Sequence, residues 1–95
     1  MSVQLVVQFA VQADKVDQFV EIMQGAKARI AAAEGCEGVE VFLSADHPTK
    51  VVLSEKWQSK ELHDVYAQKM REAGSMNAMA AFLAAPPESE LFIIK

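Results

Sequence analysis

The pattern of apolar and polar residues along this 95-residue chain predicts an α+β fold, a ferredoxin-like βαββααβ domain with a four-stranded antiparallel sheet. Two observations predict it. Four short segments alternate or run apolar as strands do, and three segments between them repeat apolar residues at helical spacing. A hairpin in the middle of the chain and a returning last strand complete the split βαβ order, which places the helices on one side of the sheet.

The first strand and the first helix are predicted from residues 3–30. Apolar residues occupy every second position of residues 3–11, as in a strand. Asp14 is expected to cap the following helix, because a carboxylate accepts hydrogen bonds from the free N–H groups of a first turn. One face of this helix carries Val16, Phe19, Val20, Met23 and Ile30, with Lys27 among them. Gly35 then stands where a left-handed residue commonly ends a helix.

A hairpin and a second helix follow. Residues 39–45 and 50–58 alternate as strands, and residues 46–49 contain the Asp and Pro that favour a turn between them. Ser59 is expected to cap a helix that ends near Gly74.

The end of the chain predicts a short helix and a last strand. Ser75 can cap the helix, whose apolar side includes Met76 and Met79. Two consecutive prolines then stop it. Residues 89–94 contain four consecutive apolar residues, a run that indicates a strand buried on both faces.

The strands carry apolar residues on the face that turns away from the predicted helices. Val6, Phe42 and Val52 lie on that second face, and no helix is predicted to cover it. A second copy of the same sheet would bury these side chains through a two-fold interface. We therefore expect a homodimer formed through the sheet face.

The composition limits the class of protein. The length fits a single domain over residues 1–95, and 52% hydrophobic residues with 23% charged residues are typical of a packed core. The net charge of −4 and the scattered Lys and Arg argue against nucleic acid as a partner. No apolar run approaches the ~20 residues of a membrane-spanning helix, and no secretion signal is recognisable, so we expect a cytoplasmic protein without a membrane partner.

The chain lacks the residue patterns of several kinds of functional site. His47 and His63 have no further ligand at metal-binding spacing, so no metal site is expected. Cys36 stands between Glu34 and Glu37, whose charges disfavour a reactive thiolate, so it is interpreted as a small packed residue. The chain contains no Gly-rich phosphate loop, no GxSxG motif and no CxxC pair.

The candidate site lies in residues 55–74, which hold the only Trp and the only Tyr of the chain. A flat aromatic molecule could bind between helices and sheet, against the ring of Trp57 and hydrogen-bonded to Tyr66, His63 or Arg71. Further candidate contacts are Leu62, Met70 and Asn77. The alternative is that Trp57 and Tyr66 only fill the core while Arg71 lies in water, and the residues alone leave both interpretations open.

The sequence resembles the antibiotic biosynthesis monooxygenase family of dimeric α+β barrels, which includes quinol monooxygenases. The resemblance rests on Asp14 after the first strand, on Glu-Gly-Cys at residues 34–36, and above all on Glu-Lys-Trp-Gln-Ser at residues 55–59. These features follow the family order over nearly the whole chain. The resemblance implies sheet-to-sheet dimers with a small-molecule cavity in each subunit.

The resemblance also implies an activity. Well-studied members oxidise quinols or phenols with O₂ and no metal or flavin, and the substrate anion itself reduces oxygen. Trp57 matches the family tryptophan. The family often has a histidine nine residues later, where this chain has Tyr66, while His63 lies one helical turn earlier. This departure puts a histidine-based mechanism in question.

Three functions remain after these considerations. The first is a cofactor-independent monooxygenase acting on a small quinol or phenol, with Tyr66, His63 and Arg71 as polar contacts. The second is a non-catalytic dimeric module that binds a small molecule, and the third is an isomerase on the same barrel. Haem cleavage is disfavoured, because haem-degrading relatives use an Asn on the first strand, where this chain offers only Gln4 and Gln8 as amides.

Overall fold

The computed structural model describes the backbone of residues 1–95 and every side chain except those of Ser75 and Met76. Its elements follow the predicted order, with one extra 3-10 turn, η1. They are β1 (Val3–Ala10), η1 (Ala13–Lys15), α1 (Val16–Ala31), β2 (Cys36–Leu43), β3 (Lys50–Trp57), α2 (Lys60–Glu72), α3 (Ser75–Ala80) and β4 (Glu88–Ile93). The predicted βαββααβ fold is confirmed.

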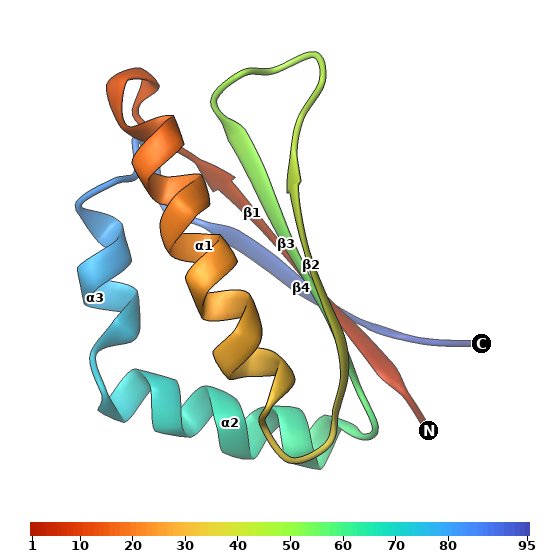
Figure 1. Ribbon diagram of the computed structural model, residues 1–95. Coiled ribbons are helices and arrows are strands. Elements are labelled where there is room, and N and C mark those ends of the chain that lie inside the picture. Colours follow the sequence, from red (N-terminus) through yellow and green to blue (C-terminus); the bar gives the residue numbers. More distant parts are fainter.

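The four strands form one sheet in the order β2-β3-β1-β4, and each neighbouring pair is antiparallel. All three helices lie on the same side of this sheet, with α1 along it and α2 across one end (Figure 1). We call the covered side the helix face and the other side the outer face. Because side chains alternate along a strand, each strand contributes to both faces.

The core lies between α1 and the helix face. Phe19 of α1 meets Phe9 of β1 edge to face, with ring centroids 5.1 Å apart. The predicted stripe of α1 is confirmed in the main, since its buried residues are Val16, Phe19, Met23, Ala26 and Ile30. Val20 packs against them while half-buried, and the amine of Lys27 lies 3.6 Å from a carboxylate oxygen of Glu40.

The predicted cap at Asp14 is wrong. Asp14 lies inside η1, and neither η1 nor α1 has a side-chain cap at its N-terminal position. Instead the backbone N–H of Lys15 donates to the carbonyl of Gln12 at 2.9 Å, and the Gln12 N–H donates to Phe82 O at 2.9 Å. The start of this helix is therefore fixed by contacts with a distant segment, which a local capping pattern does not reveal.

The other predicted helix signals hold, with one exception. The hydroxyl of Ser59 accepts a hydrogen bond from the backbone N–H of Leu62 at 3.3 Å, as an N-cap does. Gly35 and Gly74 have the left-handed φ values of 86° and 75° that glycine tolerates. The predicted cap at Ser75 is wrong, because Ser75 is the first residue of α3 and the N-cap position is Gly74, where no side chain caps the helix. The prediction that Met76 packs on the apolar side of α3 falls outside the described side chains.

The outer face has no helix over it. Phe42 and Phe92 are 52% and 46% exposed there, and Val6 and Val52 are half-buried. The amide of Gln4 donates to the hydroxyl of Ser54 on the same face. The predicted burial of β4 on both faces is therefore not seen within one chain, because β4 is an edge strand and this side of the sheet has no helix above it.

No helix within the described residues is long and apolar enough to cross a membrane.

Candidate functional site

A buried pair of side chains lies near the end of β3. Glu55 and Trp57 are two residues apart, so both point to the helix face. Trp57 is fully buried, and its indole Nε1 donates to Oε1 of Glu55 at 2.9 Å. Glu55 is only 5% exposed. A carboxylate and an indole are thus hydrogen-bonded to each other on the helix face, next to the side chains of α2.

The helix α2 places two further polar side chains beside this pair. The helix α2 begins after its cap Ser59. Residues three apart on a helix lie on the same face, so His63 and Tyr66 do. The ring of Tyr66 lies with its centroid 5.2 Å from that of Trp57, and the ring of His63 lies 5.9 Å away at 73°. We call Glu55, Trp57, His63 and Tyr66 the Trp57 cluster.

Burial governs the protonation of the cluster. It raises the pKa of Glu55, while the hydrogen bond from Trp57 and the nearness of His63 oppose that rise. Burial also raises the pKa of Tyr66, and the negative charge of Glu55 adds to the effect. The pKa of the neighbouring Cys36 thiol is raised by burial first and by Glu55 and Glu37 after it. Tyr66 is therefore a protonated hydrogen-bond donor at neutral pH.

His63 is anchored on its outward side. Its Nδ1 lies 3.1 Å from a carboxylate oxygen of Asp64, and that carboxylate also accepts from the amine of Lys60 at 2.7 Å. The His63 side chain is 14% exposed. The imidazole thus has one edge on Trp57 and the other at the surface.

The structure brings some of the predicted site residues together and leaves others apart. Trp57, His63 and Tyr66 are in contact, and Leu62 packs against the core beside them. Met70 is half-buried further along α2. Two predicted site residues, Arg71 and Asn77, are exposed.

Arg71 faces a different direction from the cluster. It follows Tyr66 by five residues, a spacing that rotates a side chain away from the shared helix face. Its guanidinium donates to the side-chain oxygen of Gln68 at 2.8 Å instead.

Sequence reasoning missed Glu55 as a candidate site residue. Alternation along residues 50–58 places Glu55 on the same strand face as Val51, Leu53 and Trp57. The signal was present, since a carboxylate at an inward position of an otherwise apolar strand face is either paired or functional.

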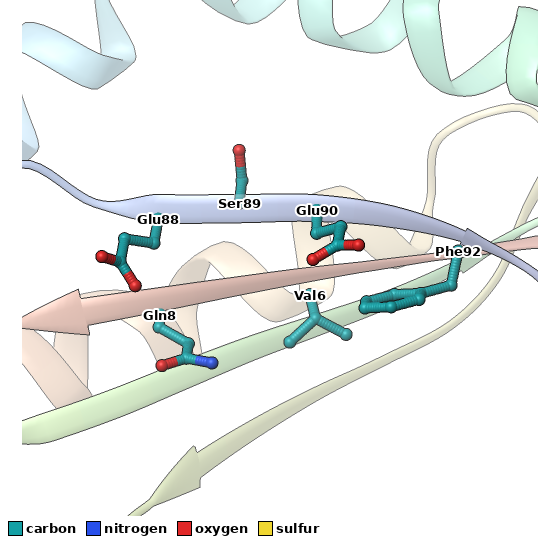
Figure 2. Close-up of a pocket in the computed structure, with 6 residues that line it drawn as sticks. All are labelled: Val6, Gln8, Glu88, Ser89, Glu90 and Phe92. Carbon is teal, nitrogen blue, oxygen red and sulfur yellow. The ribbon is translucent and has the colours of Figure 1, made fainter.

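Two hollows lie elsewhere on the molecule. One, of about 120 Å³, is on the outer face between β1 and β4, where Val6, Gln8, Glu88, Glu90 and Phe92 gather while Ser89 points the opposite way (Figure 2). The other, of about 440 Å³, lies against α1 and is lined by Gln18, Glu21, Ile22 and Phe82. Neither includes a residue of the Trp57 cluster.

Among the described residues, no group of three or more His, Cys, Asp or Glu side chains is arranged to hold a metal ion.

A sequence model of the antibiotic biosynthesis monooxygenase family matches residues 2–73. This match includes β1 to α2 and every residue of the Trp57 cluster. No curated protein sequence matches the chain.

Solved structures share the fold over nearly the whole chain. A conserved protein from Methanosarcina mazei Go1 has a TM-score of 0.89 at 17% identity, over 100% of this chain and 94% of that one. A monooxygenase from Streptomyces coelicolor in complex with nanaomycin D has a TM-score of 0.83 at 22% identity, over 99% and 88%. SnoaB, a cofactor-independent oxygenase from Streptomyces nogalater, has a TM-score of 0.85 at 17% identity, over 99% and 93%.

Proposed function

Since the chain belongs to the antibiotic biosynthesis monooxygenase family, we propose that it is a cofactor-independent monooxygenase that oxidises a small quinol or phenol with O₂. The observation that carries this proposal is the Trp57 cluster. Two aromatic rings, an imidazole and a buried carboxylate meet on the helix face, within the part of the chain that the family model matches. Such a set can bind a flat ring and exchange a proton with its hydroxyl group.

The reaction needs little from the protein beyond positioning and a proton acceptor. A phenol and O₂ give a quinone and water: one oxygen atom enters the ring, and the other leaves as water with two hydrogens from the substrate. The electrons come from the substrate anion. The aromatic rings of Trp57 and Tyr66 would hold the substrate ring, and the Tyr66 hydroxyl would donate to a substrate oxygen. Apolar surroundings would exclude bulk water from the intermediates.

The helix α2 is the element that would move to admit the substrate. Trp57 is fully buried and in contact with Tyr66, so a ligand must displace something to reach its ring. None of the α2 side chains is fully buried, whereas α1 has five buried residues. Segments with few buried contacts open at the lowest free-energy cost.

We also propose that two chains associate through their outer faces. Phe42 and Phe92 are large apolar side chains exposed there, with Val6 and Val52 between them. A two-fold pairing of this face would bury all of them and leave the helix faces free for substrate. Sedimentation at micromolar concentration tests this, and a protein that remains monomeric would contradict it.

A structural relative with a bound small molecule supports the proposal of a small-molecule ligand. The Streptomyces coelicolor monooxygenase, which shares this fold, was solved with nanaomycin D bound. For this chain we propose a ligand from the class of small aromatic compounds.

Oxygen uptake tests the proposed activity. Purified, metal-free protein would be mixed with menadiol in an oxygen electrode cell, and uptake compared with the rate in buffer alone. We expect uptake above that rate, and a lower rate for Tyr66→Phe with unchanged sedimentation. Uptake no faster than in buffer across a panel of quinols and phenols would refute the activity.

Tyr66 in place of the histidine that the family often has favours a second candidate, a non-catalytic module that binds a small molecule. A ligand that binds only the native state raises the melting temperature. A rise in melting temperature with aromatic ligands, without oxygen uptake, would support this second function over the first.

A further inference from the structure

Glu55 is the single buried side chain, among those that the structure describes, that can carry a charge. It lies on the helix face of β3 with an apolar residue opposite it on each neighbouring strand, Leu5 on β1 and Val39 on β2. Burying a carboxylate costs free energy unless a cation pairs with it. Its hydrogen-bond partner is the neutral indole of Trp57, and the nearby His63 offsets only part of the effect of burial on its pKa. This carboxylate is therefore placed where an apolar side chain would stabilise the fold better.

The two oxygens of Glu55 have different surroundings. Oε1 accepts the hydrogen bond from Trp57 Nε1 at 2.9 Å, which fixes the carboxylate plane. Within the described part of the chain, every buried polar side-chain atom has a hydrogen-bond partner. Among the described residues Glu55 accepts a hydrogen bond through Oε1 and none through Oε2, so Oε2 keeps some accessible surface. One oxygen is thus a fixed anchor, and the other can receive a hydrogen bond from a bound molecule.

We propose that Glu55 is the catalytic base of this protein, and that its Oε2 takes the proton from the hydroxyl of a quinol or phenol bound against Trp57 and Tyr66. The inference rests on the proposed function. The substrate O–H bond breaks, a Glu55 O–H bond forms, and the electron pair stays on the substrate oxygen. The resulting anion reduces O₂, and the proton leaves Glu55 in the water that the reaction releases.

Two other titratable groups that lie near Glu55 are poorer bases. Tyr66 of α2 is itself a phenol with a raised pKa, so it holds its proton. Cys36 of β2 is a thiol with a raised pKa. The Nδ1 of His63 of α2 already lies 3.1 Å from a carboxylate oxygen of Asp64, on the outward side of the ring. Proton transfer to Glu55 instead moves one negative charge from carboxylate to substrate and creates no new charge.

The raised pKa of Glu55 supports the same role. Burial raises the pKa of Glu55 and makes it a stronger base than an exposed carboxylate. The difference between the pKa of Glu55 and that of a phenol is therefore smaller. The ionised form is the active one. The rate should therefore rise with pH through the pKa of Glu55.

The test compares Glu55→Gln with the exposed Glu61→Gln of α2. Glutamine keeps an oxygen that can accept from Trp57 but cannot accept the substrate proton. We expect kcat of Glu55→Gln to fall by about 10²–10⁴-fold, with KM much less affected and the acid limb of the pH profile lost. Glu61→Gln should match the wild type in rate and pH profile. Melting temperature and Trp fluorescence verify that each variant is folded.

A second measurement does not depend on turnover. Without oxygen, 4-nitrophenol would be titrated with each protein near the pH at which it is half ionised, and the phenolate band followed. We expect the wild type and Glu61→Gln to increase the phenolate fraction, and Glu55→Gln to bind without this increase. Wild-type phenolate formation without oxygen uptake would uphold the base and refute the monooxygenase. Normal oxygen uptake and an unchanged pH profile in Glu55→Gln would refute the base alone.

Discussion

The helix face and the outer face of the sheet are made from the same four strands, yet their apolar side chains end in different environments. On the helix face, Trp57 and Val51 are completely buried under helices. On the outer face, Phe42 and Phe92 stay about half exposed. The difference lies in the single-sided placement of the helices, which follows from the βαββααβ connections (Figure 1).

The same contrast separates the polar residues. Charged side chains of the outer face, such as Glu88 and Glu90, are exposed and keep their water. Glu55 on the helix face has lost almost all of it. Burial raises the pKa of Glu55 and so makes it a stronger base than an ordinary carboxylate, which supports the proposed proton transfer on the helix face, while the exposed apolar side chains support the proposed association through the outer face.

The largest expected difference between the faces is in stability. Trp57→Ala should lower the free energy of unfolding by about 3–5 kcal/mol, because it empties a large buried site. Phe42→Ala, its counterpart on the outer face, should change it by less than about 0.5 kcal/mol in dilute solution. Urea unfolding at two protein concentrations measures both. If the outer faces pair, the loss of stability in Phe42→Ala should grow with protein concentration. Equal losses of stability in Trp57→Ala and Phe42→Ala in dilute solution would contradict the difference between the two faces.

The turn between α1 and β2, against which Leu62 of α2 packs, comes next. Gly35 has a positive φ, and a Cβ built on it would lie 2.5 Å from Leu62 Cδ1. Gly35→Ala should therefore cost at least the ~1–2 kcal/mol of a left-handed residue, with the clash in addition. Gly38→Ala is the matched control, since a Cβ there meets nothing within 4 Å. Thermal unfolding compares them, and equal stability of the two variants would contradict the strained turn.

The N-cap of α2 should have a smaller effect. Ser59→Ala removes the hydroxyl that accepts from Leu62 N and should lower the free energy of unfolding by about 1 kcal/mol. The exposed Ser89→Ala on β4 should leave it within about 0.5 kcal/mol. Since α2 carries His63 and Tyr66, the oxygen-uptake rate of Ser59→Ala should fall as well. Wild-type stability in Ser59→Ala would show that contacts with the sheet alone hold α2.

The smallest expected effect has the opposite sign. Because the pKa of Glu55 is raised in the folded protein, the folded state holds this proton more tightly than the unfolded state. Wild-type stability should therefore fall as pH rises from the ordinary glutamate pKa through the raised one. Glu55→Gln lacks this loss, so it should melt above the wild type at neutral pH and approach it at acid pH. A Glu55→Gln variant that melts below the wild type at neutral pH would contradict the destabilising effect of the buried Glu55 carboxylate.

The candidate site was predictable in part. A helix capped by Ser59 that follows the strand containing Trp57 predicts that Trp57, His63 and Tyr66 lie near one another. Arg71 and Asn77 were included because they are close in sequence, but both are exposed and Arg71 turns to Gln68. Closeness in sequence along a helix does not preserve direction, since each residue rotates by about 100°.

The sequence by itself determined the elements and their order, because strand alternation, helical spacing and glycine turns act within a few residues. It also determined that the strands have two apolar faces. Only the tertiary structure decided that Asp14 does not cap α1, since backbone contacts with Phe82 fix that turn. It likewise decided that Glu55 is buried against Trp57, because burial depends on the helices that three-dimensional packing brings over the strand.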